Sequence, residues 1–118
     1  MLGFPGDSFP TNLETLRAAG AQYLEFPVAV VEAEGDARAF EGLKSALQNA
    51  PLGVEAFNSF LPAHHRITGP KVDLKDVLEF CRVALERCKA LGGEIVVLGS
   101  AGARKVPDGF DFEVAQKQ

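Results

Sequence analysis

The sequence predicts an α/β protein in which parallel strands alternate with helices. Short apolar or aromatic runs, typical of strands, alternate with longer segments in which apolar residues recur every three or four positions, as in amphipathic helices. The run at 94–98 is almost continuously apolar, as expected for a parallel strand that is covered on both faces. Strands and helices in this order form a parallel sheet through right-handed crossover connections.

The first helix is predicted to begin at Thr11 and to end at Gly20. Thr11 can cap the helix while Glu14, three residues later, reaches back to it, which is the capping-box pattern. Gly20 readily takes the left-handed conformation that ends helices. The aromatic segment 22–26 is predicted to follow as a strand, and a further strand could precede the helix at residues 1–4.

A second helix is predicted to begin at Asp36 and to end before Pro51, because helices seldom continue into a proline. The apolar segment 28–31 follows a proline and could extend the preceding strand or form a loop; we expect a loop there. Residues 53–58 are predicted to form the second strand. The apolar stripe of the predicted helix that begins at Asp36 consists of Phe40, Leu43 and Leu47.

The strongest helix signal follows the capping residue Asp73 and stops at Gly92–Gly93. The segment 59–71 before it contains two prolines and a glycine, and is predicted to be a long loop. Residues 99–109 form a second loop, rich in small residues, and 112–118 look like the start of another helix. In the helix that follows Asp73, apolar residues keep the helical period for five turns. They are Leu74, Val77, Leu78, Cys81, Ala84, Leu85, Cys88 and Leu91.

The two cysteines, Cys81 and Cys88, are expected to be small core residues on this helix. Seven residues of helix separate their Cα atoms by about 10 Å along the axis, whereas a disulfide needs roughly 4.4–6.8 Å. Two thiols alone are also a poor metal site.

Composition indicates one domain over residues 1–118 and excludes some partners. The net charge of −4 argues against nucleic acid, which selects basic patches. No apolar run reaches the roughly 18 residues that span a bilayer, so no membrane partner is expected. The first residues lack the basic and apolar stretches of a signal peptide, which favours a cytoplasmic location.

The pattern also suggests that both ends are cut. The first strand would have at most four residues and the last helix, near 111–118, at most two turns. A TIM barrel has eight βα units in roughly 250 residues, so four units in 118 residues match half of one. On the pattern alone, a natural four-stranded open sheet is an equal alternative.

Three stretches resemble one family in the same order. Residues 18–25 read Ala-Ala-Gly-Ala-Gln-Tyr-Leu-Glu, and 55–62 read Glu-Ala-Phe-Asn-Ser-Phe-Leu-Pro, followed by Thr-Gly-Pro at 68–70. The loop at 98–110 reads Leu-Gly-Ser-Ala-Gly-Ala-Arg-Lys-Val-Pro-Asp-Gly-Phe and is the most specific of the three. Together they resemble the N-terminal half of sugar-phosphate isomerases and epimerases with a xylose-isomerase-like TIM barrel.

The resemblance implies a (β/α)8 barrel that isomerises or epimerises a sugar or sugar phosphate beside its carbonyl. It also implies a divalent metal, Mn²⁺, Mg²⁺ or Zn²⁺, at the C-terminal mouth. The family's Glu, Asp and His ligands come mainly from the second half of the barrel. We therefore expect no metal in this chain alone, and no activity without the other half.

Two residues at predicted strand ends could contact the substrate. Glu25 lies at the C-terminal end of its strand, which faces the active site in a barrel, and could act as a catalytic base or bind a hydroxyl group. An ordinary solvated carboxylate is the alternative. Asn58 ends the next strand and could fix sugar hydroxyls, or could bond its own backbone in a turn.

The loop after the last strand offers Ser100 and Arg104 as substrate-binding residues. Small residues leave its backbone N–H groups accessible, and the Arg104 guanidinium suits phosphate or carboxylate. Alternatively, Arg104 pairs with a neighbour such as Asp108. His64–His65 is expected to be a solvated loop pair rather than a metal site, because adjacent residues seldom ligate one ion.

Two other functions remain open beside the enzyme. The chain could be a non-catalytic sugar- or phosphate-binding module, or a structural fragment. In each case four strands cut from a closed barrel would expose edges, so we expect self-association or pairing with a complementing half-barrel.

Overall fold

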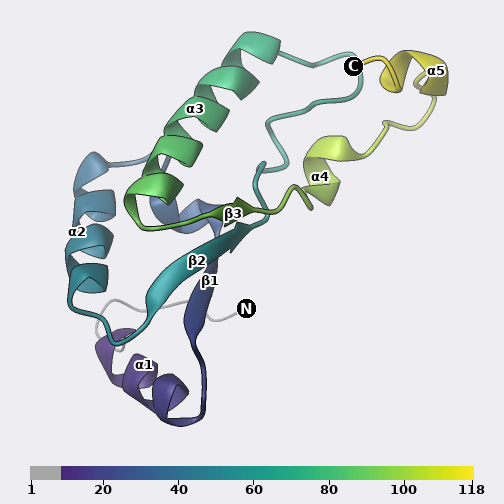
Figure 1. Cartoon of the computed structure of the whole chain (residues 1–118). Helices are drawn as coiled ribbons and strands as arrows, with labels where there is room; N and C mark the ends of the chain where they lie inside the picture. Colours follow the sequence, from purple (N-terminus) through teal and green to yellow (C-terminus); the bar gives the residue numbers. More distant parts are fainter. Residues whose placement is uncertain (1–8) are drawn as a thin grey trace.

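The computed structural model describes residues 9–118 and shows a three-stranded parallel sheet in the order β1–β2–β3 (Figure 1). The strands are β1 (Tyr23–Pro27), β2 (Gly53–Asn58) and β3 (Ile95–Val96). Both neighbouring pairs are parallel. The predicted α/β class and parallel sheet are therefore confirmed.

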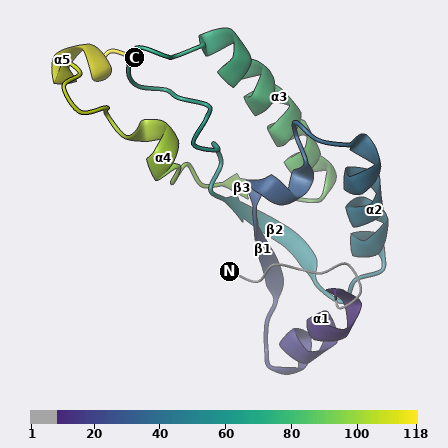
Figure 2. The same ribbon diagram turned by 180° about the vertical axis from the view of Figure 1, so that it is seen from behind.

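The helical elements are α1 (Phe9–Ala18), the 3-10 turn η1 (Val28–Val31), α2 (Ala37–Gln48), α3 (Leu74–Ala90), α4 (Ala101–Arg104) and α5 (Phe112–Ala115). Helices α2 and α3 form the crossovers between strands and lie on one side of the strands, whereas α4 and α5, which follow β3, lie on the other side in this view (Figure 2). None of the helices in residues 9–118 is long and apolar enough to cross a membrane.

The main helix boundaries follow local chemistry. Asp36 caps α2 by accepting a hydrogen bond from the backbone N–H of Arg38 at 2.8 Å, and Asp73 caps α3 in the same way through Asp76 at 3.1 Å. Gly20 follows the end of α1 with a φ of 99°, a conformation that a glycine adopts without strain. These predicted starts and stops are confirmed.

Three local predictions are wrong. The first helix begins at Phe9 rather than Thr11, because Pro10 is tolerated in a first turn, where its missing N–H has no helical acceptor. Residues 28–31 form η1 instead of a loop, and 101–104 form a helical turn within the expected loop. The possible strand at residues 1–4 lies outside the described residues.

One face of the sheet carries the core. Phe26 of β1 and Phe57 of β2 are register partners and both are buried. Side chains from α2 and α3 pack on the same core cluster, so these helices cover this side of the sheet. The cluster's helical members include Phe40, Val77, Phe80, Ala84 and Cys88.

The other face of the sheet is open, and the prediction that 94–98 is covered on both faces is wrong. Only Ile95 and Val96 pair as β3, and Ile95 and Val97 are 53% and 48% exposed. The continuous apolar run reflects a strand suited to burial, but within residues 9–118 no layer covers this face and no strand pairs beyond β3.

Helix α3 likewise buries only part of its apolar surface. Val77, Phe80, Ala84 and Cys88 face the core, while Leu74, Leu78 and Leu85 are exposed. Both cysteines are free, as expected. Burial raises the pKa of the Cys81 thiol and raises that of Cys88 to about 11.

We expect the two thiols to react in sequence with an alkylating reagent at neutral pH. Cys81 is only partly buried and should react in the folded protein, whereas Cys88 is 1% exposed and should react only after unfolding. Mass spectrometry of native and urea-treated protein measures this order. Cys81→Ser is the control and should leave no thiol that reacts rapidly in the native state; equal rates for both cysteines would contradict the packing of α3.

Candidate functional site

Glu25 and Asn58 meet at the C-terminal edge of the sheet. Because β1 and β2 are parallel neighbours, their carboxyl ends lie at the same edge, with Pro27 opposite Asn58 in the register. The side-chain amide of Asn58 donates a hydrogen bond from Nδ2 to Oε1 of Glu25 at 2.7 Å. Glu25 is exposed and Asn58 half-buried, so solvent can reach the pair.

An amide that holds a carboxylate in this way fixes the direction of its oxygens. The pair can accept hydrogen bonds from the hydroxyl groups of a ligand. A carboxylate in such a position can also take a proton from a bound molecule, provided that the proton lies within hydrogen-bond reach.

Ser100 and Arg104 are placed differently from Glu25 and Asn58. The Ser100 hydroxyl is buried and accepts a hydrogen bond from the backbone N–H of Leu61 at 2.7 Å. Arg104 is exposed, and its Nη1 donates to the carbonyl oxygens of Leu98 and Gly99 at 3.3 and 3.2 Å. In the described chain these carbonyl contacts, and not Asp108, hold the guanidinium.

The loop between β2 and α3 is tied to the C-terminal segment along its length. The backbone N–H of Ile67 donates to the carbonyl of Ala103 at 3.1 Å, and the Arg66 guanidinium donates to the carbonyls of Gly102 and Lys105. Further along, Gly69 exchanges two hydrogen bonds with the side chain of Gln118. These contacts fix the backbone that carries His64 and His65.

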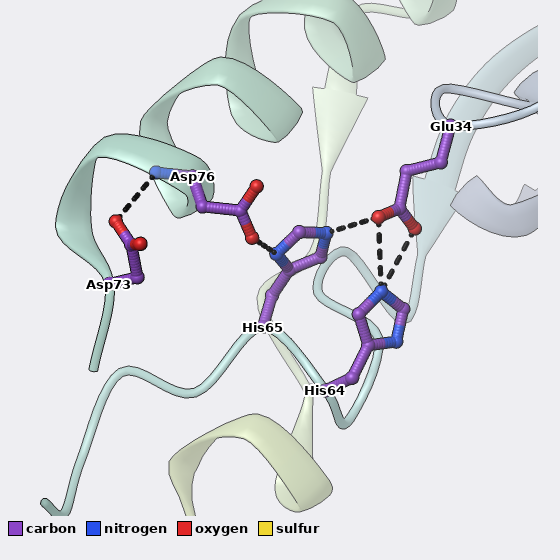
Figure 3. Close-up of polar contacts among 5 residues, drawn as sticks. All are labelled: Glu34, His64, His65, Asp73 and Asp76. Carbon is purple, nitrogen blue, oxygen red and sulfur yellow. Dashed lines mark hydrogen bonds and ion pairs between the residues drawn. The ribbon is translucent and has the colours of Figure 1, made fainter. Parts of the chain in front are cut away.

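His64 and His65 converge on one carboxylate (Figure 3). Nε2 of His65 lies 2.8 Å from Oε1 of Glu34, and Nε2 of His64 lies 3.0 Å from Oε2. His65 is only 2% exposed, so the expectation of a solvated pair is wrong for this residue. The three residues form the one group of potential metal ligands identified within the described part of the chain.

The ring of His65 is fixed on two further sides. It packs against the ring of Phe80, with centroids 4.5 Å apart, and its Nδ1 lies 3.0 Å from Oδ2 of Asp76. This second contact is a close ion-pair approach whose angles fall outside a hydrogen bond, so Nδ1 is a buried nitrogen without a hydrogen bond among the described residues. The cap by Asp73 holds the turn of α3 that carries Asp76 (Figure 3).

Glu34 is ionised more readily than an ordinary glutamate. Partial burial alone would raise the pKa of its carboxyl group, but the hydrogen bonds and charges of His64 and His65 outweigh this effect and lower the pKa. A carboxylate beside two imidazoles is therefore the expected state at neutral pH.

A cleft of about 370 Å³ adjoins Glu34. Its walls come from the segment after β1 and the loop after β2, with Phe80 of α3 contributing as well. The cleft lies on the helix side of the sheet edge, while Glu25 and Asn58 stand toward the open face. The edge thus carries two separate groups of polar side chains.

The sequence contained one signal for the Glu34–His64–His65 group. Glu34 and the two histidines follow neighbouring parallel strands, and the segments after such strands meet at one edge. Adjacency of the histidines in sequence argued against a shared ligand, but their rings are tilted by 40° and both present Nε2 to the same carboxylate.

Comparisons of the chain with protein-family models, with curated proteins and with solved structures find no match.

We expect Ser100→Ala to destabilise the fold through the loop after β2. The change removes the acceptor of the Leu61 N–H, and an unsatisfied buried donor costs on the order of 1–3 kcal/mol. Urea denaturation measures the loss in the free energy of unfolding. Ser59→Ala, at an exposed residue of the same loop, is a control for local mutation; a loss below about 0.5 kcal/mol for Ser100→Ala would show that water replaces the hydroxyl.

Proposed function

We propose that this chain is the N-terminal half of a metal-dependent sugar or sugar-phosphate isomerase or epimerase, built as about half of a xylose-isomerase-like TIM barrel. The observation that carries the proposal is the contact between Glu25 and Asn58. Both residues belong to the stretches that resemble this family, and both stand at the strand ends where barrel enzymes bind substrate.

The exposed apolar surface supports the same proposal. In a closed barrel the inner face of the sheet is filled by side chains from other strands, and each outer helix packs against its neighbours. The open side of the sheet leaves Tyr23, Ile95 and Val97 exposed, and α3 leaves Leu78 and Leu85 exposed. Additional βα units would bury these surfaces.

Within this function Glu25 is the proposed base. It would take a proton from the carbon beside the substrate carbonyl while Asn58 keeps the carboxylate in place. Returning the proton to the neighbouring carbon, while the hydroxyl proton moves to the former carbonyl oxygen, gives isomerisation. Epimerisation would need a second acid that delivers a proton to the opposite face of the same carbon while Glu25 keeps the first. A divalent metal supplies polarisation of the carbonyl in this chemistry, and its ligands are expected mainly from the second half of the barrel.

Ser100 and Arg104 have a supporting part in the proposal. Ser100 holds the loop after β2 against the loop after β3 through Leu61. In the loop after β3, Arg104 donates to the carbonyls of Leu98 and Gly99. In the proposed enzyme its guanidinium would exchange one of these contacts for a substrate phosphate.

Sugar binding by the chain alone tests the Glu25–Asn58 pair. We expect a panel of aldoses, ketoses and their phosphates to include a ligand that shifts the NMR signals of residues 25 and 58. Glu25→Gln should weaken this binding about ten- to a hundredfold, because a bond to a charged group contributes roughly 1.5–3 kcal/mol. Glu55→Gln is the matched control, since Glu55 is an exposed carboxylate on β2.

The reaction itself requires the complementing half. If the reading frame continues beyond Gln118, the longer product should exchange the proton beside the sugar carbonyl with D₂O, and Glu25→Gln should abolish this exchange. Phosphate binding that depends on Arg104 but not on Glu25 would favour the non-catalytic module instead. Absence of both sugar and phosphate binding would leave the structural fragment.

We expect the isolated chain to self-associate as its concentration rises. A second copy can cover the open sheet face and pair with the edge at β3. Ile95→Lys places a charge at this edge and should shift the association to higher concentration in sedimentation experiments. Leu16→Lys, at an exposed leucine of α1, is the control; a stable monomer at millimolar concentration would contradict the expectation.

A further inference from the structure

We propose that Glu34, His64 and His65 bind a Zn²⁺-class transition-metal ion through three protein ligands, leaving one coordination position for water or a ligand. This site is separate from the Glu25–Asn58 pair and does not rest on the proposed isomerase function. It replaces the expectation that this chain holds no metal.

The ligand atoms are close to the spacing that a metal needs. One carboxylate oxygen and two imidazole nitrogens lie within 4.8 Å of one another, and the carboxylate oxygens lie 2.8–3.1 Å from the two Nε2 atoms. Tetrahedral zinc with bonds of about 2.1 Å separates its ligands by about 3.4 Å. An ion is admitted when the carboxylate–nitrogen distances lengthen by a few tenths of an ångström and the two nitrogens, at most 4.8 Å apart, settle at about 3.4 Å.

The side chains that must move are the ones free to do so. Glu34 is 49% exposed and His64 is 62% exposed, whereas His65 is almost fully buried. His65 is thus the fixed ligand, and the other two can close around an ion from the solvent side. Exposure of these two ligands also leaves the open coordination position toward water.

Asp76 completes the arrangement around His65. A histidine that binds metal through Nε2 usually directs its Nδ1–H to a carboxylate, which fixes the tautomer and the ring orientation. Oδ2 of Asp76 stands 3.0 Å from this buried Nδ1, which lacks a hydrogen bond among the described residues. Metal binding at Nε2 places the remaining proton on Nδ1, and a small rotation of the exposed Asp76 carboxylate would let Oδ2 accept a hydrogen bond from it.

Both backbone segments are already held in place. On one side, the backbone N–H of His65 donates to the carbonyl of Pro62, and Leu61 is anchored to Ser100. On the other side, Arg87 of α3 donates to the carbonyls of Val31 and Glu32, just before Glu34. A site on such fixed supports loses little conformational entropy when it binds an ion.

The ligand types select the class of metal. Imidazole nitrogen suits Zn²⁺, Co²⁺ and Ni²⁺, whereas Mg²⁺ and Ca²⁺ prefer sites made of oxygen ligands. Two His and one Glu with an open position is the ligand set of catalytic zinc sites. The two carboxylates of Glu34 and Asp76 also balance the charge of a divalent ion.

Titration of the untagged, chelator-treated chain with Zn²⁺ tests the site. Calorimetry should give one ion per chain, and Co²⁺ should give the visible absorption of a four- or five-coordinate complex. Glu34→Gln and His64→Ala remove exposed ligands without disturbing the core, and each should weaken Zn²⁺ binding at least tenfold. Asp76→Asn should weaken it about ten- to a hundredfold.

Two variants serve as controls. Glu32→Gln changes an exposed carboxylate two residues from Glu34 and should leave Zn²⁺ binding unchanged. Cys81→Ser removes the more accessible thiol and should also leave it unchanged. A melting temperature that rises with Zn²⁺ in the unaltered chain, but not in Glu34→Gln, provides a second readout.

The proposal is overturned if no Zn²⁺ binds below about 1 mM. It is equally overturned if Glu34→Gln and His64→Ala, shown by circular dichroism to be folded, bind Zn²⁺ as tightly as the unaltered chain. Neither result depends on sugar binding, so failure of this site and failure of the proposed isomerase function are separately observable.

Discussion

Parallel pairing of β1 with β2 is the constraint on which the polar chemistry of this chain depends. It brings the carboxyl ends of both strands to one edge, and the pairing of β2 with β3 adds the third strand in the same direction. As a result Glu25 reaches Asn58, Glu34 reaches His64 and His65, and the loops after β2 and β3 are joined by Leu61 and Ser100. An antiparallel β1–β2 pair would send these segments to opposite edges.

Helix α3 holds in place the segments that this topology brings together. Its buried face supplies Phe80, which packs under His65, and its first turn carries Asp76, which stands beside the same ring. Near its other end, Arg87 lies over the ring of Phe40 and holds the carbonyls at the end of η1. One helix therefore supports both the histidine-bearing loop and the segment that carries Glu34.

Local signals in the sequence were sufficient for most of the fold, and non-local contacts explain what they missed. Asp36, Asp73 and the strand 53–58 were predictable because capping and strand patterns act over a few neighbouring residues. The sequence placed Glu25 and Asn58 at strand ends, and the parallel pairing of β1 with β2 then brings their side chains into contact. Burial of His65 was not predictable in this way, because it depends on Phe80, fifteen residues later, and on Glu34, thirty-one residues earlier. The short length of β3 was not predictable either, because the described residues include no further strand to pair with it, and no local pattern reports this.

The two sides of the sheet edge differ in the chemistry they can support. On the helix side, a buried imidazole with a carboxylate behind it has the order and protection that a metal ligand requires. On the open side, the Glu25–Asn58 pair is accessible and stands over apolar side chains that lack a covering layer. A base and a metal that act on one carbonyl must face the same substrate, so an ion held by Glu34, His64 and His65 would not replace the metal of an isomerase at Glu25. The proposed enzyme therefore still needs ligands from additional strands, whereas the proposed zinc site would draw its three protein ligands from this chain.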